Sequence, residues 1–505
     1  MDNSKNTAVN NIPKAFMLFL ILLPAAGLFL IKCSIDNDFY FFYPTGEYII
    51  NNGFPFNDIL SFHSDMHITV QQWLLDVVLY YVYYYCGKAG IMAYVYIFYL
   101  IICTASYKLC KTISENSFVA AVCALITDII VALEYALSRP QVISYTVFIL
   151  EVYILEKYVK TKNTKLLILI PLLSLALINI HASMWLLFFV FAMPYVAAAI
   201  PFKFKKIEQK PCCSFWALLI TGVISFAVGF INPYGIKAMT YGVVSFGNSE
   251  LHALVSEMET TTLKSSLGII FYSLLAAAVL IMIFKKNKRF SLRFFLLFAG
   301  TAFIAVTNTK SVAFFIILGV PAFSYFIGDV QPKIPTDEGK KNQDKKAAAL
   351  LGVFFVLISF AAAVSNSTLP VSGLLFKDET QYGSMDEIVE ELDKTDPDKI
   401  LLFTNIDAGP YFEFKGYHPY IDCRMELFLK EINGSYDYFG EYIDVCTGKT
   451  YYKDFLDKYG FTHLVLTVNE GALLEGVKND SDYILVKDIV INNSAYGEKY
   501  LFVHK

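Results

Sequence analysis

Long apolar segments with almost no charge recur along the chain, and they limit the folds open to it. A membrane-spanning helix needs about 20 consecutive apolar residues, and about eleven such helices can be drawn. They lie near residues 15–31, 89–107, 117–136, 141–156, 166–180, 183–200, 214–231, 267–284, 291–307, 311–327 and 347–364. Only 17% of the 505 residues are charged, whereas soluble domains carry about 25%. The sequence therefore predicts an α-helical polytopic membrane protein.

Lysine and arginine residues predict which connections face the cytoplasm. They are concentrated in alternate connections, at residues 108–111, 157–165, 203–210, 285–293 and 333–346. The positive-inside rule places these connections, and a tail of residues 1–14, in the cytoplasm. The opposite, extracytoplasmic side then holds a long first loop, 32–88, and everything after residue 364. The predicted domains are the tail 1–14, a transmembrane domain 15–364 and an extracytoplasmic domain 365–505.

The C-terminal residues differ in pattern from the membrane domain. Residues 399–405 and 463–468 are short apolar strand candidates. Residues 385–394 and 452–460 have amphipathic helical patterns, the second ending at Gly460. Alternating strands and helices predict a small α/β domain. In the first loop, the aromatic-rich residues 73–86 predict a helix at the membrane interface.

Composition also excludes some functions. The net charge of −4 argues against nucleic-acid binding. The nine cysteines have no metal-binding spacing, so they predict no zinc site. Cys423 and Cys446 lie on the predicted oxidising side, where a disulfide is open but not derivable.

Polar residues from distant parts of the chain fall on the predicted outer side. Ionisable residues near a membrane are costly, so such a group predicts a functional site. The candidates are Asp36, Asp38 and Asp58 in the first loop, Arg139 in SRPQ, Asn179 and His181 in INIHAS, Asn232 in NPYG, Glu257, Lys310 in TNTK, and Asp422 and Arg424 in YIDCR.

Each candidate also has a simpler interpretation. The Asp pair can cap a helix, Arg139 can reach lipid headgroups, and Asn179 with His181 can form an interhelical hydrogen bond. NPYG can be a helix stop, Lys310 can mark the interface, and Glu257 can be an ordinary loop acid. Asp422 and Arg424 can form a structural turn or ion pair.

Several short motifs together resemble one family. The first loop reads DNDFYFFYPTGEYI, then NGFPFNDILSF and QQWLLD, and it is followed by RPQ, NIHAS, NPYG, SEM, DAGPY and YIDCR. In order and spacing, from about residue 14 to 505, they resemble bacterial GT-C-type membrane glycosyltransferases, which are distant relatives of protein O-mannosyltransferases and lipid-A aminoarabinose transferases.

The resemblance implies a transferase acting on a sugar attached to a polyprenyl phosphate, with a cell-envelope glycan, lipid or protein as acceptor. Asp36 or Asp38 would be the catalytic carboxylate, and Arg139 and Lys310, helped by His181, would bind the donor phosphate. Tyr40 and Trp73 would support the sugar ring. Further sugar or acceptor contacts are assigned to Asp58, Asn179, Asn232, Glu257, Asp422 and Arg424. No cofactor is required, and a divalent metal ion between two outer carboxylates is allowed.

Two departures from the family pattern keep other functions open. Relatives tend to have His where this chain has Phe42, and His-Glu where it has Gln71 and Gln72. A reduced site or a non-catalytic scaffold for envelope assembly is therefore an alternative. A transporter or flippase of lipid-linked glycans is another, although it predicts polar groups near mid-membrane or paired broken helices, and the candidates lie at the outer boundary instead.

Overall fold

The computed structural model describes residues 35–204, 207–209, 211–246, 259–285, 290–329, 383–489 and 498–505. The predicted helices 15–31 and 347–364 and the candidate residue Glu257 lie outside these residues, as do the predicted domain boundaries near 14 and 364. The chain divides into two compact units. We call them the helical unit (Met1–Cys33, Met92–Gly242 and Asn248–Pro370) and the mixed unit (Ser34–Ile91, Val243–Gly247 and Val371–Lys505).

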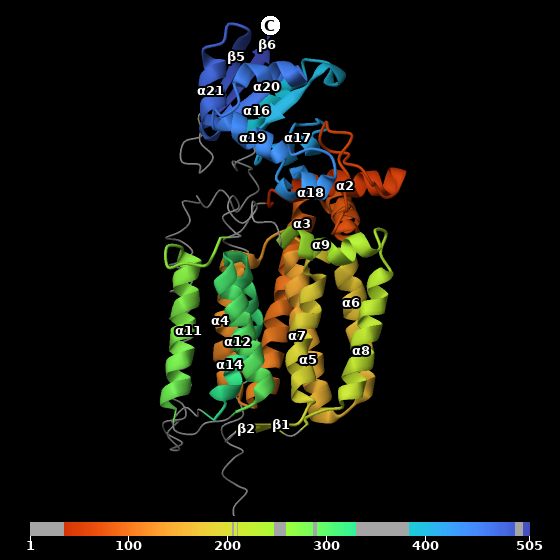
Figure 1. Cartoon of the computed structure of the whole chain (residues 1–505), viewed down its shortest axis with the longest axis vertical. Helices are drawn as coiled ribbons and strands as arrows, with labels where there is room; N and C mark the ends of the chain where they lie inside the picture. Colours follow the sequence, from red (N-terminus) through yellow and green to blue (C-terminus); the bar gives the residue numbers. More distant parts are fainter. Residues whose placement is uncertain are drawn as a thin grey trace, which may run out of the picture. The chain divides into compact units, whose positions relative to one another are not determined.

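The helical unit is built from apolar helices that run roughly parallel to one another (Figure 1). These are α4 (Ser117–Ile130), α5 (Gln141–Thr161), α6 (Leu169–Ile180), α7 (Trp185–Ala198), α8 (Phe215–Ala227), α11 (Ser266–Phe284), α12 (Leu292–Thr307) and α14 (Val320–Phe326). Helix α9 (Ile236–Phe246) lies across their direction (Figure 1). Each predicted span that falls on described residues is helical. Polar caps set several starts: the side chains of Asn116, Ser214 and Ser265 accept backbone N–H groups of the first turn.

Four of the described helical segments are long and apolar enough to cross a membrane. They are Trp73–Ser114, Ser117–Tyr135, Ser266–Phe284 and Thr309–Phe326. The predicted break within 166–200 is confirmed, because α6 ends at Ile180 and His181 has non-helical backbone angles.

Helix α3 (Trp73–Ser114) joins the two units and is not continuous. Gly87 has φ 58° and ψ −153°, which interrupts the helix, and glycine takes such angles at no steric cost. Residues 73–86 are therefore helical, as predicted, and a second helical stretch follows the kink.

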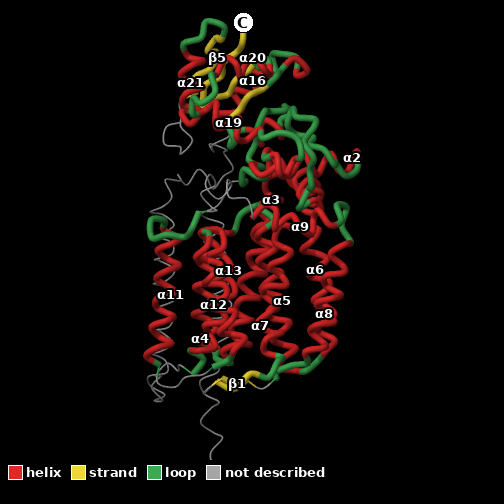
Figure 2. The backbone as a smooth tube through the Cα atoms, in the orientation of Figure 1, coloured by secondary structure: helices red, strands yellow, loops and turns green. Residues whose placement is uncertain are grey.

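The mixed unit contains a four-stranded sheet with helices around it (Figure 2). The strands are β3 (Leu402–Thr404), β4 (His463–Thr467), β5 (Tyr483–Ile489) and β6 (Lys499–His504), in the order β3-β4-β6-β5. β3 and β4 are parallel, and the other pairs are antiparallel. The main helices are α2 (Phe39–Asn52), α16 (Gly383–Leu392), α17 (Gly409–Phe414), α19 (Tyr438–Cys446), α20 (Tyr452–Tyr459) and α21 (Gly471–Lys478). This confirms the predicted C-terminal mixed α/β region.

The first-loop residues pack with the C-terminal residues in the mixed unit. The Tyr40 ring of α2 contacts the rings of Tyr411 and Phe414 of α17, with centroids 5.2 and 5.3 Å apart. Further along, the Phe62 N–H donates to the Pro419 carbonyl at 3.3 Å. The loop is therefore an ordered part of this unit, and these contacts hold its carboxylates against the C-terminal residues.

Candidate functional site

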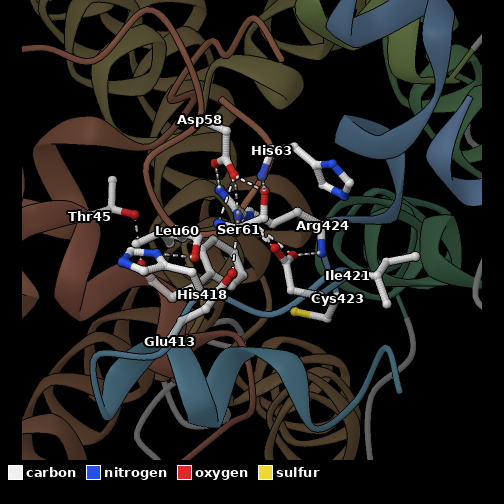
Figure 3. Close-up of polar contacts among 12 residues, drawn as sticks. Thr45, Asp58, Leu60, Ser61, His63, Glu413, His418, Ile421, Cys423 and Arg424 are labelled. Atoms are coloured by element: carbon white, nitrogen blue, oxygen red, sulfur yellow. Dashed lines mark hydrogen bonds and ion pairs between the residues drawn. The ribbon is translucent and has the colours of Figure 1, made fainter. Parts of the chain in front are cut away.

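Arg424 lies at the centre of a buried ion-pair cluster in the mixed unit (Figure 3). Its Nη1 is 2.7 Å from Asp58 Oδ1, and its Nη2 is 2.5 Å from Asp422 Oδ2 and 3.3 Å from Glu413 Oε1. The backbone N–H and the Oγ of Ser61 also donate to Asp58, at 2.9 and 2.6 Å. The ion-pair interpretation of Asp422 and Arg424 is thus observed, and Asp58 belongs to the same cluster.

Three carboxyl groups surround the one guanidinium of this cluster. The pKa values of Asp58 and Glu413 are shifted in opposite directions. Burial would raise the pKa of Asp58, but the Arg424 charge and the Ser61 hydrogen bonds outweigh it and lower that pKa. Burial and the neighbouring Asp422 raise the pKa of Glu413 well above its usual range. Asp58 therefore loses its proton more readily than an ordinary aspartic acid, and Glu413 loses its proton less readily than an ordinary glutamic acid. A single acid in the apolar run AGPYFEF was the only sequence signal for Glu413.

The DAGPY and YIDCR motifs meet at Gly409. A Cβ atom added there would lie 2.3 Å from the Ile421 carbonyl oxygen and 2.8 Å from the Asp422 Cα. Only a residue without a side chain lets these backbones approach so closely. Gly409 therefore supports the position of Asp422.

This close approach leads to a stability prediction. Gly409→Ala is expected to lower the free energy of unfolding by about 1–3 kcal/mol, because backbone atoms must shift to admit the methyl group. Urea denaturation of the full chain in detergent measures it. Gly471→Ala is the matched control, since a Cβ at Gly471 meets nothing within 4 Å. Equal stability of the two variants would contradict the close-packing argument.

Asp36 and Asp38 lie at the start of α2 and are half-buried. Asp38 occupies the N-cap position, but its side chain makes no capping hydrogen bond. Its backbone N–H donates to Asp36 Oδ1 at 3.1 Å, and the Cys423 thiol lies 3.6 Å from Asp38 Oδ1. Between them, Asn37 Nδ2 donates to the Asp407 carbonyl at 3.0 Å. The DND run thus contacts both C-terminal motifs, DAGPY through Asn37 and YIDCR through Asp38.

The predicted sugar-binding aromatics differ in their packing. Tyr40 packs against α17, as described above, whereas Trp73 opens α3 and contacts the Phe54 ring edge-on at 5.1 Å. Phe42, which stands where relatives tend to have His, is 2% exposed and packs on Phe41. Phe42 therefore fills the core of this unit.

His63 is a buried histidine that the sequence analysis did not single out. Its Nε2 lies 2.9 Å from the Tyr420 carbonyl oxygen, and its ring contacts the Tyr438 ring in a tilted arrangement with centroids 3.8 Å apart. Burial lowers the pKa of His63 from 6.5 to about 4, against the smaller opposing effects of the Tyr420 hydrogen bond and nearby acids, Asp58 first. His63 is therefore neutral at pH 7.

A pH dependence of stability follows. Between pH 6.5 and about 4 the unfolded chain binds a proton at His63 and the folded chain does not, so acidification favours unfolding. We expect the His63 contribution to lower the free energy of unfolding by about 3 kcal/mol over this range. Comparing denaturation of the wild type and His63→Gln at several pH values isolates this contribution. Identical pH slopes would contradict it.

The helical unit brings several other candidates together at helix ends. His181 Nδ1 is 2.7 Å from Ser144 Oγ, which also contacts the carbonyl of Pro140, the residue after Arg139, at 3.3 Å. Lys310 lies close enough to His181 for an electrostatic interaction. Arg139 is half-buried, and its carbonyl accepts a hydrogen bond from Tyr94 at 3.2 Å.

The two asparagines bind backbone carbonyls in this unit. Asn179 Nδ2 donates to the carbonyls of Leu175 and Ile231, both at 2.9 Å. Asn232 Nδ2 donates to the Gly229 carbonyl at 2.6 Å, and its Oδ1 accepts the Tyr234 N–H at 2.8 Å. The helix-stop interpretation of NPYG is observed. Asn179 and His181 do bind residues of other segments, but these are Ile231 and Ser144 and not each other. The binding roles of both asparagines stay predictions.

Within the described ranges, no group of three or more His, Cys, Asp or Glu side chains could hold a metal ion. Asp58 and Asp422 are bound to Arg424. The divalent ion allowed by the resemblance stays a prediction.

Comparison with known proteins identifies the fold. No protein-family model and no curated protein sequence matches the chain. Among solved structures, the chain is similar to the archaeal oligosaccharyltransferase AglB from Archaeoglobus fulgidus in complex with an inhibitory peptide and a dolichol-phosphate. The TM-score is 0.54 at 9% identity, over 96% of this chain and 74% of that one. The Archaeoglobus fulgidus oligosaccharyltransferase in complex with Zn and sulfate gives a TM-score of 0.52 at 11% identity, over 95% of this chain and 72% of that one.

A second enzyme is also similar. ArnT from Cupriavidus metallidurans bound to undecaprenyl phosphate gives a TM-score of 0.49 at 11% identity, over 97% of this chain and 98% of that one. The fold assignment rests on the archaeal enzyme, whose TM-score is higher. The chain has the fold of the GT-C membrane glycosyltransferases over nearly its whole length. It is an integral membrane protein.

Proposed function

We propose that the chain is a membrane glycosyltransferase that moves a sugar from a polyprenyl-phosphate-linked donor to a cell-envelope glycan, lipid or protein on the extracytoplasmic face. The observation that carries the proposal is the fold, shared over 96% of the chain with an enzyme solved with a dolichol-phosphate. The half-buried carboxylates at the start of α2 supply the acid–base chemistry that such a transfer needs.

In the proposed reaction, the carboxylate of Asp38 or Asp36 takes the proton from an acceptor hydroxyl or amine. The acceptor oxygen or nitrogen forms a bond to the anomeric carbon while the bond from that carbon to the phosphate oxygen breaks. The electron pair of the broken bond stays on the polyprenyl phosphate. No nucleotide takes part.

The leaving phosphate gains charge, so cationic or hydrogen-bonding partners favour its departure. Arg139 and Lys310 are proposed for this role, with His181 beside them. The electrostatic interaction between Lys310 and His181 in the helical unit supports these two residues acting together. Trp73 and Tyr40 are proposed to contact the sugar, with Asp58, Asp422 and Arg424 supporting the acceptor side through their shared cluster.

A prediction on donor binding follows. Lys310→Met and Arg139→Met are each expected to raise the KM for the polyprenyl-phosphate donor about tenfold, with the acceptor KM within twofold of the wild type. A lost charge-assisted contact of about 1.5 kcal/mol corresponds to this change. Initial rates at varied donor and acceptor concentrations measure it. Lys264→Met, at an exposed lysine of the same unit, is the control; an unchanged donor KM in both variants would contradict the assignment.

The cellular test compares lipid-linked sugars and envelope glycans by mass spectrometry in cells with and without the protein. We expect one sugar to disappear from an acceptor while its polyprenyl-phosphate donor accumulates, and the wild-type chain to reverse both changes. If donor and acceptor pools are unchanged, the transferase proposal is wrong and a scaffold role becomes the better interpretation.

A further inference from the structure

The turn Asp422–Cys423–Arg424 contributes its two outer residues to the buried ion-pair cluster. Its middle residue contacts the carboxylate of Asp38, with the thiol 3.6 Å from Asp38 Oδ1. Its two outer residues are bound to each other, and Arg424 is also bound to Asp58 of the first loop. The turn is therefore the physical connection between the cluster and the proposed catalytic carboxylates.

Contacts on several sides restrict the position of this turn. The Arg424 backbone N–H donates to Asp422 Oδ1 at 2.6 Å, and Arg424 Nε donates to the same oxygen at 3.0 Å. The far end of the guanidinium binds Asp58 at 2.7 Å, while the backbone of Gly409 packs against Asp422. Planar, bidentate arginine contacts fix geometry as well as charge.

We propose that Arg424 is a positioning residue for Asp38. By binding Asp58 and Asp422 at once, it holds Cys423 where the thiol donates to Oδ1 of the Asp38 carboxylate and so restricts the position of that carboxylate. The inference rests on the proposed function, in which Asp38 is a catalytic base. A displacement of about 1 Å in such a group can lower a rate 100-fold.

The kinetic test uses Arg424→Lys, which keeps the charge and loses the planar fork. The expected result is a kcat at least tenfold lower, with a donor KM within twofold of the wild type. Arg293→Lys is the matched control, because Arg293 forms another buried pair, 2.7 Å from Glu156, in the helical unit. Its kcat should stay within twofold.

Two substitutions of Cys423 test whether Arg424 affects kcat through the Cys423 thiol. Cys423→Ser keeps a donor and should retain kcat, whereas Cys423→Ala should lower it. Since Arg424 acts through Cys423 in this proposal, the double variant with Arg424→Lys and Cys423→Ala should be no slower than the slower single variant. Losses that multiply would overturn the proposal.

An independent readout needs no activity. The alkylation rate of Cys423 in the folded full chain, measured per peptide by mass spectrometry, should rise at least threefold in Arg424→Lys. Cys446 of the same unit is also a free, half-buried thiol and should react at its wild-type rate. Equal acceleration of both thiols would show general loosening and overturn the proposal, as would no acceleration of Cys423.

The two readouts separate the failure of this inference from that of the proposed function. If the wild type transfers no sugar, the proposed function is wrong. The contact of Cys423 with Asp38 then has no role in catalysis. If the wild type is active and Cys423 alkylation does not respond to Arg424→Lys, the positioning role is wrong while the transferase proposal stands.

Discussion

Replacing Asp38 by Asn is expected to lower kcat for sugar transfer at least about 100-fold, and Asp36→Asn is expected to do the same if that carboxylate takes the proton. General-base catalysis contributes about 100-fold to 10,000-fold to a rate. Asn has the shape of Asp and can still accept hydrogen bonds from the Asp38 N–H or the Cys423 thiol, so the fold should persist. Only the capacity to take a proton is removed.

The measurement is the initial rate of transfer by purified full-length variants, with insertion and yield checked in parallel. Asp437→Asn is the matched control. Asp437 is a half-buried N-cap whose Oδ1 accepts the Gly440 N–H at 2.9 Å, and Asn caps helices as well as Asp does. Full activity in both the Asp36 and Asp38 variants would refute the assignment of the catalytic carboxylate.

Arg424→Met is expected to lower the free energy of unfolding of the mixed unit by about 3–5 kcal/mol, because removing one partner leaves buried charges uncompensated. The Asp58 and Asp422 carboxylates would keep their burial and lose the cation that lies 2.7 and 2.5 Å away. Urea denaturation of the full chain in detergent, followed by limited proteolysis of the mixed unit, measures the change.

The control for this prediction is an exposed pair. Lys449 lies 2.9 Å from Asp444, and the two side chains are 71% and 43% exposed, so Lys449→Met should cost less than about 1 kcal/mol. Adding Asp58→Asn to Arg424→Met should restore part of the lost stability by removing a buried charge. A loss no larger than that of Lys449→Met would mean that the cluster does not stabilise the unit.

Local sequence patterns predicted most of the secondary structure. The strand candidates at 399–405 and 463–468 contain β3 and β4, and the helix predicted over 452–460 is α20, which ends before Gly460 with that glycine at φ 68°. Each of these signals lies within a few residues of the element it predicts. The apolar segments predicted the membrane helices for the same reason.

The candidate site was predicted less completely. Asp422 and Arg424 are two positions apart, so their ion pair could be raised as an alternative from the sequence. The bond from Arg424 to Asp58 joins residues 366 positions apart, and no periodic pattern carries that information. Burial by distant segments raises the pKa of Glu413 and lowers the pKa of His63.

The sequence by itself determined that this protein has apolar helices of membrane length and a C-terminal α/β region, because helix and strand periodicity depend on neighbouring residues. It also supplied the carboxylates of the DND run as candidates for chemistry. The tertiary structure decided that the first loop and the C-terminal residues form one unit around Arg424. The reason is physical: burial and ion pairing depend on which distant segments pack together.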